Sequence, residues 1–473
     1  ISRGLVGSEM CIRDRRIRIL IQFKFMKYSH HNLSPLDNRY RDKVSDITEC
    51  FSESALIKVR FVIEIEWLIF LCTNYPKKFK PLSKASISKL KKFKTNFSDK
   101  DVIRIKNIEK KTNHDVKAVE YFIRDYFKKD KNLTKYINLI HFGLTSEDVN
   151  SLSYAVMIEN GNKILIKKVS KLITQLNKMS SKWKNITFLS RTHGQAASPS
   201  TLGKEIKVIS KRLSREIETF KKIKGLAKFS GATGNYHTFN MVDSSINWQK
   251  ASKRFINSFG IQQNKVTTQI EPHDWIAEVM HVMIRINNIS IDLSQDMWTY
   301  ISNDIFKMNL IENEVGSSTM PHKVNPIDFE NAEGNFGLSN ALANHFSDKL
   351  TKSRLQRDLS DSTVLRNIGN AYGYSHLALS SLNKGLNKLT PNKTVINNEL
   401  DDNWEVLTEA VQTVMRYEGI NDAYEQLKSF SRGRKITRET YIEFVTNLKI
   451  SKSSKDKLLK LTPFNYIGLA KKL

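Results

Sequence analysis

One short segment of the chain combines residue types that could move a proton and stabilise a negative charge. Residues 316–326 read Gly-Ser-Ser-Thr-Met-Pro-His-Lys-Val-Asn-Pro, and the glycine and two prolines exclude the interior of a helix. A serine hydroxyl in such a loop can move a proton, while Lys323 and Asn325 can stabilise a carboxylate on which charge accumulates. Because serine is a poor base, its alkoxide requires a cation nearby, and Lys323 is the candidate. This composition predicts proton abstraction beside a carboxylate, with an ordinary polar connector as the alternative.

Rigid elements must hold such a loop, and three apolar stripes predict that these elements are long helices. Apolar residues recur in steps of three and four, the period of one helix face, in three series: Leu165, Val169, Leu172, Leu176, Met179 and Trp183; Ile206, Ile209, Leu213, Ile217, Phe220 and Ile223; and Trp275, Val279, Val282, Ile286, Ile289 and Leu293. The third series follows Pro272, where Asp274 suits the positive end of a helix dipole. Nothing alternates convincingly with a period of two. The sequence therefore predicts an all-α fold with a long central helical bundle.

Length and composition agree with this fold class. A chain of 473 residues is too long for one core, so two or three domains are expected, and only 19 glycines and 9 prolines favour uninterrupted helices. The 76 Lys and Arg against 48 Asp and Glu give a formal charge of +28. These positive charges are scattered, with no dense tract and little aromatic interleaving. A solvated surface is therefore favoured over a dedicated nucleic-acid groove, and no specific nucleic-acid partner is expected.

The cysteines and the N-terminal segment indicate the cellular compartment in which the protein is expected. The three cysteines, Cys11, Cys50 and Cys72, show no ligand spacing, so we expect no disulfide framework, no zinc site and a reducing cytoplasm. Residues 19–26 are too short and too polar to span a membrane. Residues 1–25 are interpreted as a non-native leader that precedes a natural start at Met26.

Changes of pattern divide the rest of the chain into three predicted domains. Residues 26–111 mix short helical patterns with polar runs and predict an N-terminal helical domain. Residues 112–367 hold the long stripes and the loop around Lys323, which predicts the central bundle domain. Residues 368–473 return to shorter helical segments and predict a C-terminal helical domain.

The serine-rich loop resembles the signature of a known superfamily. The pattern Ser-Ser-x-Met-Pro-x-Lys-x-Asn-Pro over residues 317–326 is similar to that of the fumarase/aspartase superfamily. Further segments resemble its bacterial adenylosuccinate lyase family: residues 34–40 (SPLDNRY), 112–116 (TNHDV), 145–148 (TSED), 191–195 (RTHGQ), 269–274 (QIEPHD) and 356–367 (QRDLSDSTVLRN). The likeness extends from about residue 34 to the C-terminus. It implies a three-domain helical subunit and a homotetramer in which residues from three subunits build each active site. No metal and no organic cofactor are implied.

The resemblance implies an acid, a base and groups that assist them. Ser317 matches the general base that removes the Cβ proton of a succinyl group, and His193 matches the general acid that protonates the departing nitrogen. Taken alone, a histidine in this context is more often a surface or buried structural residue. His114 matches a second histidine that orients the substrate. Glu330 matches a carboxylate that polarises this histidine. Lys323 and Asn325 match the groups that hold the carboxylate beside the carbanion.

The resemblance also implies a set of substrate-binding residues. Thr145 and Ser146 match hydroxyls that grip the fumarate portion, although each could equally cap a helix. Arg357, Ser362 and Arg366 match phosphate-binding positions, and their spacing of five and four puts them near one face if the segment is helical. The remaining implied contacts are Arg39 and Tyr40 near the nucleotide, Gln269 near the amide or carboxylate, and the motif residues Asn113, Asp115, Ser318 and Met320. Ala196, where the pattern has proline, and His237 depart from it.

The implied activity is the elimination of fumarate from adenylosuccinate and from the succinylated aminoimidazole carboxamide ribotide in purine biosynthesis. A nearby alternative is another fumarate-releasing enzyme of the superfamily, such as argininosuccinate lyase. Its substrate has no phosphate, so the arginines at 357 and 366 would be unnecessary. A different class of function, a basic binding protein without chemistry, predicts salt-sensitive nucleic-acid affinity that does not depend on Ser317 or His193.

Overall fold

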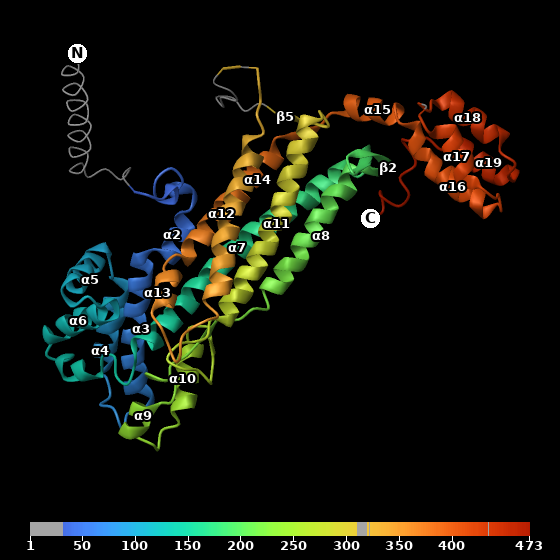
Figure 1. Ribbon diagram of the computed structural model, residues 1–473. Helices are drawn as coiled ribbons and strands as arrows, with labels where there is room; N and C mark the ends of the chain where they lie inside the picture. Colours follow the sequence, from blue (N-terminus) through green and yellow to red (C-terminus); the bar gives the residue numbers. More distant parts are fainter. Residues whose placement is uncertain (1–31, 310–318, 321, 434) are drawn as a thin grey trace, which may run out of the picture. The chain divides into compact units, whose positions relative to one another are not determined.

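The computed structural model describes residues 32–309, 319–320, 322–433 and 435–473 (Figure 1). The predicted leader at residues 1–25 and the predicted site residues Ser317 and Ser318 lie outside the described residues. The chain divides into two compact units, Ile1–Ser45 and Asp46–Leu473. The three-domain division expected from the sequence stays a prediction.

The described part of the first unit contains two short 3₁₀ helices, η2 (Pro35–Asp37) and η3 (Arg41–Lys43). The hydroxyl of Ser34 accepts a hydrogen bond of 3.2 Å from the backbone N–H of Leu36, and Pro35 occupies the first turn. Arg39 and Tyr40 lie between the two helices, with the Arg39 guanidinium 5.7 Å from the centre of the Tyr40 ring.

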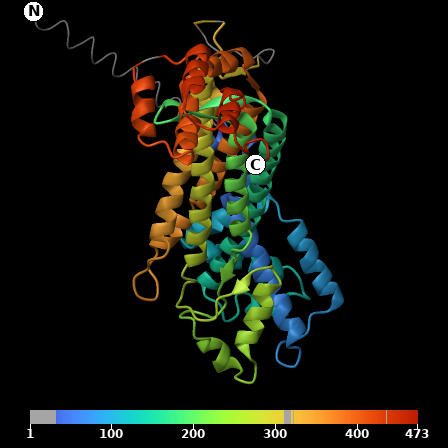
Figure 2. The ribbon, with the colours of Figure 1, turned by 90° about the vertical axis from the view of Figure 1, so that its right-hand side faces the viewer.

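A bundle of five long helices forms the centre of the second unit. These are α7 (Ser146–Trp183), α8 (Leu202–Phe220), α11 (Asp274–Ser302), α12 (Ile327–Lys349) and α14 (Ile368–Asn387). Helix α7 packs against α8 and α14, α11 packs against α8 and α12, and α12 packs against α14, which closes the bundle. Figures 1 and 2, two views at right angles, show these helices side by side.

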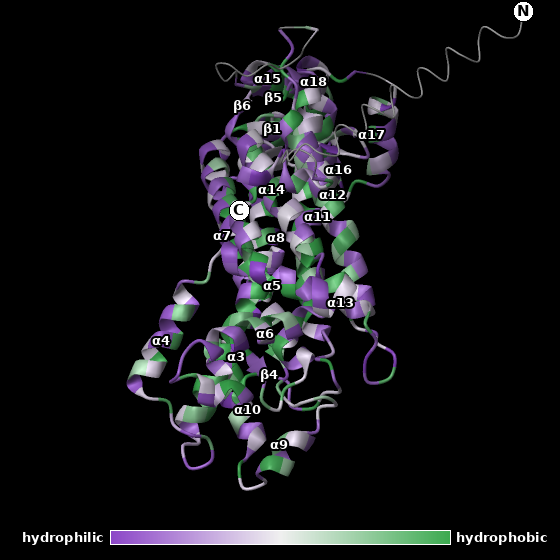
Figure 3. Ribbon diagram, turned by 90° about the vertical axis from the view of Figure 1, so that its left-hand side faces the viewer, coloured by the Kyte–Doolittle hydropathy of each residue, from purple (hydrophilic) through white to green (hydrophobic). Residues whose placement is uncertain are grey.

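The apolar stripes of the sequence form the core of this bundle. Every residue of the first and third series is buried, within α7 and α11 respectively. The second series is buried from Ile206 to Phe220, but α8 ends at Phe220, so Ile223 lies outside the helix. Figure 3 shows hydrophobic and hydrophilic residues mixed along the long helices, as expected for helices with one apolar face. The predicted all-α class and central bundle are confirmed.

Shorter helices precede, interrupt and follow the bundle. The preceding helices are α2 (Ser45–Phe51), α3 (Glu53–Asn74), α4 (Lys84–Thr95), α5 (Asp99–Thr112), α6 (Asp115–Lys128) and η4 (Thr134–Leu139). Helices α9 (His237–Val242) and α10 (Trp248–Asn257) lie between α8 and α11 in the chain, and α13 (Ser360–Leu365) precedes α14. The C-terminal helices are α15 (Lys393–Asp401), η5 (Trp404–Leu407), α16 (Thr408–Tyr417), α17 (Ala423–Ser431), α18 (Arg438–Asn447) and α19 (Lys452–Leu459). Within the described residues, no helix is both long enough and apolar enough to cross a membrane.

Three pairs of short strands accompany the helices, although the sequence showed no convincing alternation. Strand β1 (Thr187–Thr192) pairs antiparallel with β2 (Gln195–Thr201), β3 (Leu226–Ala227) pairs parallel with β4 (Gln262–Gln263), and β5 (Phe306–Met308) pairs antiparallel with β6 (Leu389–Pro391). The hairpin of β1 and β2 joins α7 to α8. Its strands lack a strict period because the pairing shifts between Phe188 and Ser190.

The close approach of α7 and α8 yields a first prediction. A Cβ atom at Gly203 would lie 2.4 Å from the Ser180 carbonyl oxygen and 2.5 Å from the Lys184 Cα. Because both are backbone atoms, Gly203→Ala must push the helices apart, and we expect it to lower the free energy of unfolding by about 1–3 kcal/mol. Urea denaturation at fixed protein concentration measures the change. Lys211→Ala, at an exposed position of α8, is the control, and equal stability of the two variants would contradict the prediction.

Candidate active site

An open pocket of about 800 Å³ brings together predicted site residues from three separate segments of the chain. Its lining comprises Glu109, Asn113, His114, Asp115, Ser146, Asn150, Arg357, Leu359, Ser362 and Arg366. The first four come from the junction of α5 and α6, the next two from the start of α7, and the last four from α13 and the residues beside it. These segments share a pocket only because the chain folds back on itself. We refer to this cavity as the arginine pocket.

Two helices begin at the arginine pocket, and their first turns favour an anion. His114 caps α6, and its Nδ1 accepts a hydrogen bond of 3.1 Å from the backbone N–H of Lys117. Thr145 caps α7 in a capping box, in which its own backbone N–H donates to Asp148 at 2.9 Å. The alternative that Thr145 caps a helix is thus confirmed. Because helix dipoles give these ends positive potential, the pocket suits a negatively charged ligand.

Asp115 links two arginines at one side of the arginine pocket. Its Oδ2 lies 2.8 Å from Nη1 of Arg60 and 2.6 Å from Nη2 of Arg366. Burial would raise the pKa of the Asp115 carboxyl, but Arg60 and Arg366 lower it to about 2. Asp115 is therefore ionised at neutral pH and fixes the direction of the Arg366 guanidinium, 40% of whose side chain stays exposed.

Arg357 occupies the other side of the arginine pocket. Its Nη2 lies 2.8 Å from Glu147, whose side chain is 2% exposed, and its Nη1 donates to Gln269 at 3.4 Å. Gln269 in turn donates to the carbonyl of Ala232 at 3.0 Å. Asn150 connects the two sides, since it accepts from Arg60 at 2.9 Å and donates to Glu147 at 3.5 Å.

The placement of Arg357, Ser362 and Arg366 corrects one structural expectation. They do not share a face of one helix, because α13 spans only Ser360–Leu365, so that Arg357 precedes it and Arg366 is its C-cap. They nevertheless line one pocket. The turn around Asp358, which accepts the backbone N–H groups of Arg354 and Ser360, brings Arg357 back toward α13.

A buried ion pair underlies the start of α7. Lys228 Nζ lies 2.8 Å from Asp148 Oδ1, and both side chains are 0% exposed. Lys228 also donates to the carbonyls of Gly231 and Gln269 at 2.7 and 2.9 Å. Asp148 accepts the backbone N–H groups of Ser230 and Gly231. The pair thereby fixes the cap of α7 and the backbone of Gln269 against the same loop.

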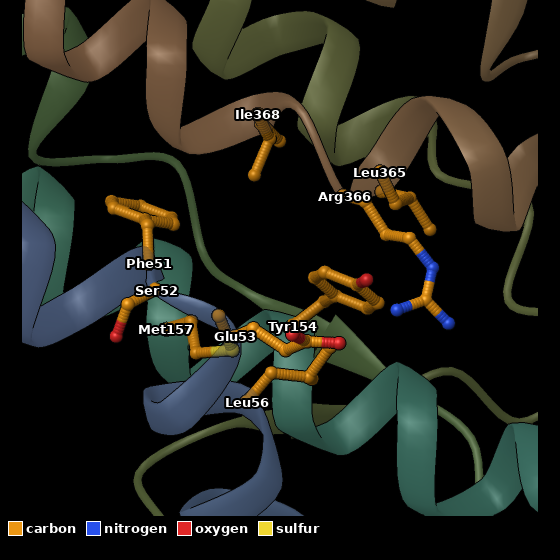
Figure 4. Close-up of a pocket in the computed structure, with 9 residues that line it drawn as sticks. All are labelled: Phe51, Ser52, Glu53, Leu56, Tyr154, Met157, Leu365, Arg366 and Ile368. Carbon is orange, nitrogen blue, oxygen red and sulfur yellow. The ribbon is translucent and has the colours of Figure 1, made fainter. Parts of the chain in front are cut away.

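Figure 4 shows a second pocket, of about 430 Å³. Arg366 lines both this pocket and the arginine pocket. The other walls of the second pocket are mostly apolar, from Phe51, Leu56, Met157, Leu365 and Ile368, with Ser52, Glu53 and Tyr154 beside them. Of the predicted site residues it contains Arg366 alone. The arginine pocket is therefore the better candidate for a polar, charged substrate.

The predicted acid His193 lies at the tip of the β1–β2 hairpin. Thr192 pairs with Gln195, so His193 and Gly194 form a two-residue turn, with positive φ angles of 54° and 76° as such a hairpin requires. The His193 side chain is exposed, and the neighbouring Arg191 forms an ion pair with Glu399 of α15. A His-Gly pair between two short polar runs was the signal for this turn.

The described part of the serine-rich loop lies near the start of α12. Met320 is 52% exposed, Lys323 is exposed and Asn325 is partly buried. Glu330, in the first turn of α12, accepts a hydrogen bond of 3.1 Å from the indole of Trp298, near the end of α11. Glu330 is thus on the outside of the bundle, beside the end of α11.

Within one chain, the two groups of predicted residues lie at opposite ends of the bundle. Ser146 is the first residue of α7 and Trp183 the last, and 38 helical residues extend about 57 Å at 1.5 Å per residue. The hairpin with His193 follows Trp183, whose ring lies 5.2 Å from that of Phe306, just beyond α11. His193, Lys323, Asn325 and Glu330 therefore do not join the arginine pocket in a single chain.

Several residues of the site were not singled out from the sequence. They are Arg60, Glu147, Asp148, Asn150 and Lys228, which hold the pocket residues through buried polar contacts. Arg60 and Glu64 in an otherwise apolar stretch of α3 were a signal, because charged residues are seldom buried without a partner. Within the described part of the chain, no group of three or more His, Cys, Asp and Glu side chains could hold a metal ion.

Comparisons with known proteins agree with the fold and with the family resemblance. Residues 38–338 match the lyase family and residues 353–467 match the adenylosuccinate lyase C-terminal family. The chain is 47% identical over 443 residues to an adenylosuccinate lyase of Buchnera aphidicola subsp. Schizaphis graminum, covering 93% of this chain and 97% of that protein. It is 45% identical over 440 residues to the adenylosuccinate lyase of Escherichia coli K12, covering 93% and 96%.

A solved structure shares the fold. A fumarate lyase from Mesorhizobium sp. BNC1 superimposes with a TM-score of 0.74 at 15% identity and covers 90% of this chain and 96% of that one. The fold and the matched motifs are those of the fumarase/aspartase superfamily of lyases. Within it, the chain belongs to the adenylosuccinate lyase family of carbon–nitrogen lyases.

The buried pair beneath α7 yields a second prediction. Lys228→Met leaves the Asp148 carboxylate buried without its cation, and we expect the free energy of unfolding to fall by about 3–5 kcal/mol. Urea denaturation is the measurement. Lys78→Met removes the cation of an ion pair whose lysine side chain is 50% exposed, and we expect a much smaller change. A similar decrease in the free energy of unfolding in both variants would show that the buried pair stabilises the protein no more than an exposed one.

Proposed function

We propose that the protein cleaves adenylosuccinate to AMP and fumarate, and the succinylated aminoimidazole carboxamide ribotide to its carboxamide and fumarate. In this β-elimination a base removes a proton from Cβ of the succinyl group. The electron pair of that C–H bond becomes the new double bond of fumarate, and the C–N bond breaks. The departing nitrogen takes a proton from an acid, so that charge and atoms balance.

The arginine pocket is the observation that carries this proposal. Its arginines, its serine at 362 and its two helix starts form a site for a doubly charged phosphate, and an arginine fork matches two phosphate oxygens. Asp115 and Glu147 hold the two guanidiniums in place before a ligand arrives, which lowers the entropic cost of binding. Arg39 and Tyr40 are proposed to approach the same nucleotide, and Gln269 its amide or carboxylate region.

Near the reacting carbon, Thr145 and Ser146 are proposed to grip the fumarate portion, with Asn113, Asp115, Ser318 and Met320 as further contacts. His114 is proposed to orient the substrate, since its ring already lies in the pocket. Lys323 and Asn325 would stabilise the doubly charged carboxylate beside the carbanion, and Glu330 would polarise a histidine. Ser317 acts as the general base and His193 as the general acid.

We propose that active sites are shared between subunits, and the position of these groups supports this. His193 and the arginine pocket lie at opposite ends of α7, so a complete site requires the hairpin end of another copy. We propose a homotetramer in which bundles from different subunits lie side by side in opposite directions. The hairpin end of one subunit then meets the arginine pocket of another. The enzyme is proposed to act in the cytoplasm, without metal or organic cofactor.

The acid and base roles yield a third prediction. Ser317→Ala and His193→Ala should each lower kcat for adenylosuccinate at least roughly 100-fold, because each removes a proton-transfer group. An ultraviolet assay of the purified protein measures this loss. Retention of full activity in either variant would remove that residue from the mechanism.

The shared site can be tested in the same assay with hybrids. His193→Ala and His114→Ala subunits, co-expressed with different tags and purified through both, should regain activity that neither variant has alone. Regain is expected because some sites then receive an intact residue from each end of the bundle. A doubly tagged preparation of His193→Ala alone is the control, and inactive hybrids would mean that one subunit builds its own site.

The phosphate role yields a fourth prediction. Arg357→Gln and Arg366→Gln each remove a charged hydrogen-bond donor, and each should raise KM for adenylosuccinate roughly 10- to 100-fold, with a smaller effect on kcat. Arg416→Gln, at an exposed position of α16, is the control. If both pocket variants keep a normal KM, or the wild type cleaves argininosuccinate instead, a substrate without phosphate is indicated.

A further inference from the structure

His273, which no part of the proposed mechanism uses, lies behind the arginine pocket. It caps α11 with a positive φ of 67°, and only 3% of its surface is exposed. Its Nδ1 lies 3.6 Å from Glu271 Oε2, and its Nε2 lies 3.8 Å from Asp361 Oδ2. The ring therefore lies between two buried carboxylates from segments that meet at this end of the bundle.

These carboxylates keep His273 positively charged. Burial alone would lower the pKa of the imidazole, but Asp361 and Glu271, with a smaller contribution from Glu147, raise it to about 9. Glu271 is fixed in position by hydrogen bonds from Trp275 Nε1 at 3.0 Å and from the His273 backbone N–H at 2.9 Å. His273 is thus a buried cation at neutral pH.

The second oxygen of Asp361 connects His273 to Arg357. Asp361 Oδ1 lies 3.9 Å from Arg357 Nη2, the same nitrogen that lies 2.8 Å from Glu147. The Nε atom of Arg357 is buried and has no hydrogen-bond partner. Arg357 therefore lies between two buried carboxylates, and the balance between them decides how far its guanidinium reaches into the pocket.

We propose that His273 is a positioning residue for Arg357: it neutralises Asp361, which leaves the guanidinium with Glu147 and directed into the arginine pocket. Without this cation, Asp361 and Glu147 face a single arginine. Asp361 then draws Arg357 toward the interior and away from the phosphate of the substrate. The inference rests on the proposed function, in which Arg357 binds that phosphate.

A double-mutant cycle between His273 and Arg357 tests the inference. His273→Gln should raise KM for adenylosuccinate roughly tenfold, with kcat within about threefold of the wild type, because transition-state groups are untouched. In the Arg357→Gln background, the same change should alter kcat/KM less than about twofold, because its target is already gone. A merely structural defect would lower the fraction of active enzyme and hence kcat, and would leave KM unchanged.

His376→Gln is the matched control, because His376 is another buried histidine of the bundle. Its Nε2 lies 3.2 Å from Lys168 Nζ, and burial followed by this lysine lowers its pKa to about 4, so it is neutral and distant from the pocket residues. We expect a normal KM in this variant. A KM increase equal to that of His273→Gln would overturn the inference.

The remaining outcomes separate the inference from the proposed function. A wild-type protein that does not cleave adenylosuccinate refutes the proposed function itself. Normal wild-type activity with an unchanged KM in His273→Gln, or equal losses in both arginine backgrounds, refutes the inference alone. If His273→Gln does not fold, it is combined with Asp361→Asn: KM should then stay within about twofold of the wild type in Asp361→Asn with or without His273→Gln, because the carboxylate that would draw Arg357 away is gone, and a tenfold higher KM in either variant would overturn the inference. If neither variant folds, the cluster serves folding rather than positioning, and the inference is wrong.

Discussion

The buried pair of Lys228 and Asp148 is the constraint on which the site depends. Neither side chain has exposed surface, so each charge must be satisfied within the protein, and loss of either partner would leave the other as an uncompensated buried charge. Asp148 closes the cap of α7 and accepts two backbone N–H groups of the loop at Ser230 and Gly231. Lys228 holds the carbonyl of Gln269. The pair thereby connects the start of the longest helix to the segment that leads into α11, and Ser146 in the same helix start lines the arginine pocket.

The pocket itself is a balance of charges rather than a cluster of arginines. Asp115 pairs with both Arg60 and Arg366, while Glu147 pairs with Arg357. Each acid lowers the repulsion between cations that face one cavity, and each fixes a guanidinium in one direction. An anionic ligand would then meet guanidiniums that are already held in position, which lowers the entropic cost of binding. The pairing also explains how carboxylates can line the proposed phosphate site.

The sequence predicted three of the five bundle helices, α7, α8 and α11, because their apolar residues repeat with the period of a helix face. It also predicted the pocket residues Asn113, Ser146, Ser362 and Arg366, since these stand in motifs. It did not predict what holds them: Arg366 and Asp115 stand 251 residues apart, and Ser230 and Asp148 stand 82 apart. Such pairs leave no periodic signal. The hairpin that carries His193 was missed because its strands are short and irregular in register.

The length of α7 has a consequence for how catalytic groups can be arranged. A helix of about 57 Å separates the arginine pocket from His193, whereas proton transfer requires hydrogen-bond contact between the acid and the departing nitrogen. No rearrangement of side chains bridges such a distance, and a packed bundle does not shorten. If His193 is the acid, it must reach the arginine pocket of a neighbouring copy. Under the proposed roles, the rigidity that fixes the pocket in one chain makes assembly a condition of catalysis, because binding and proton transfer then belong to opposite ends of the bundle.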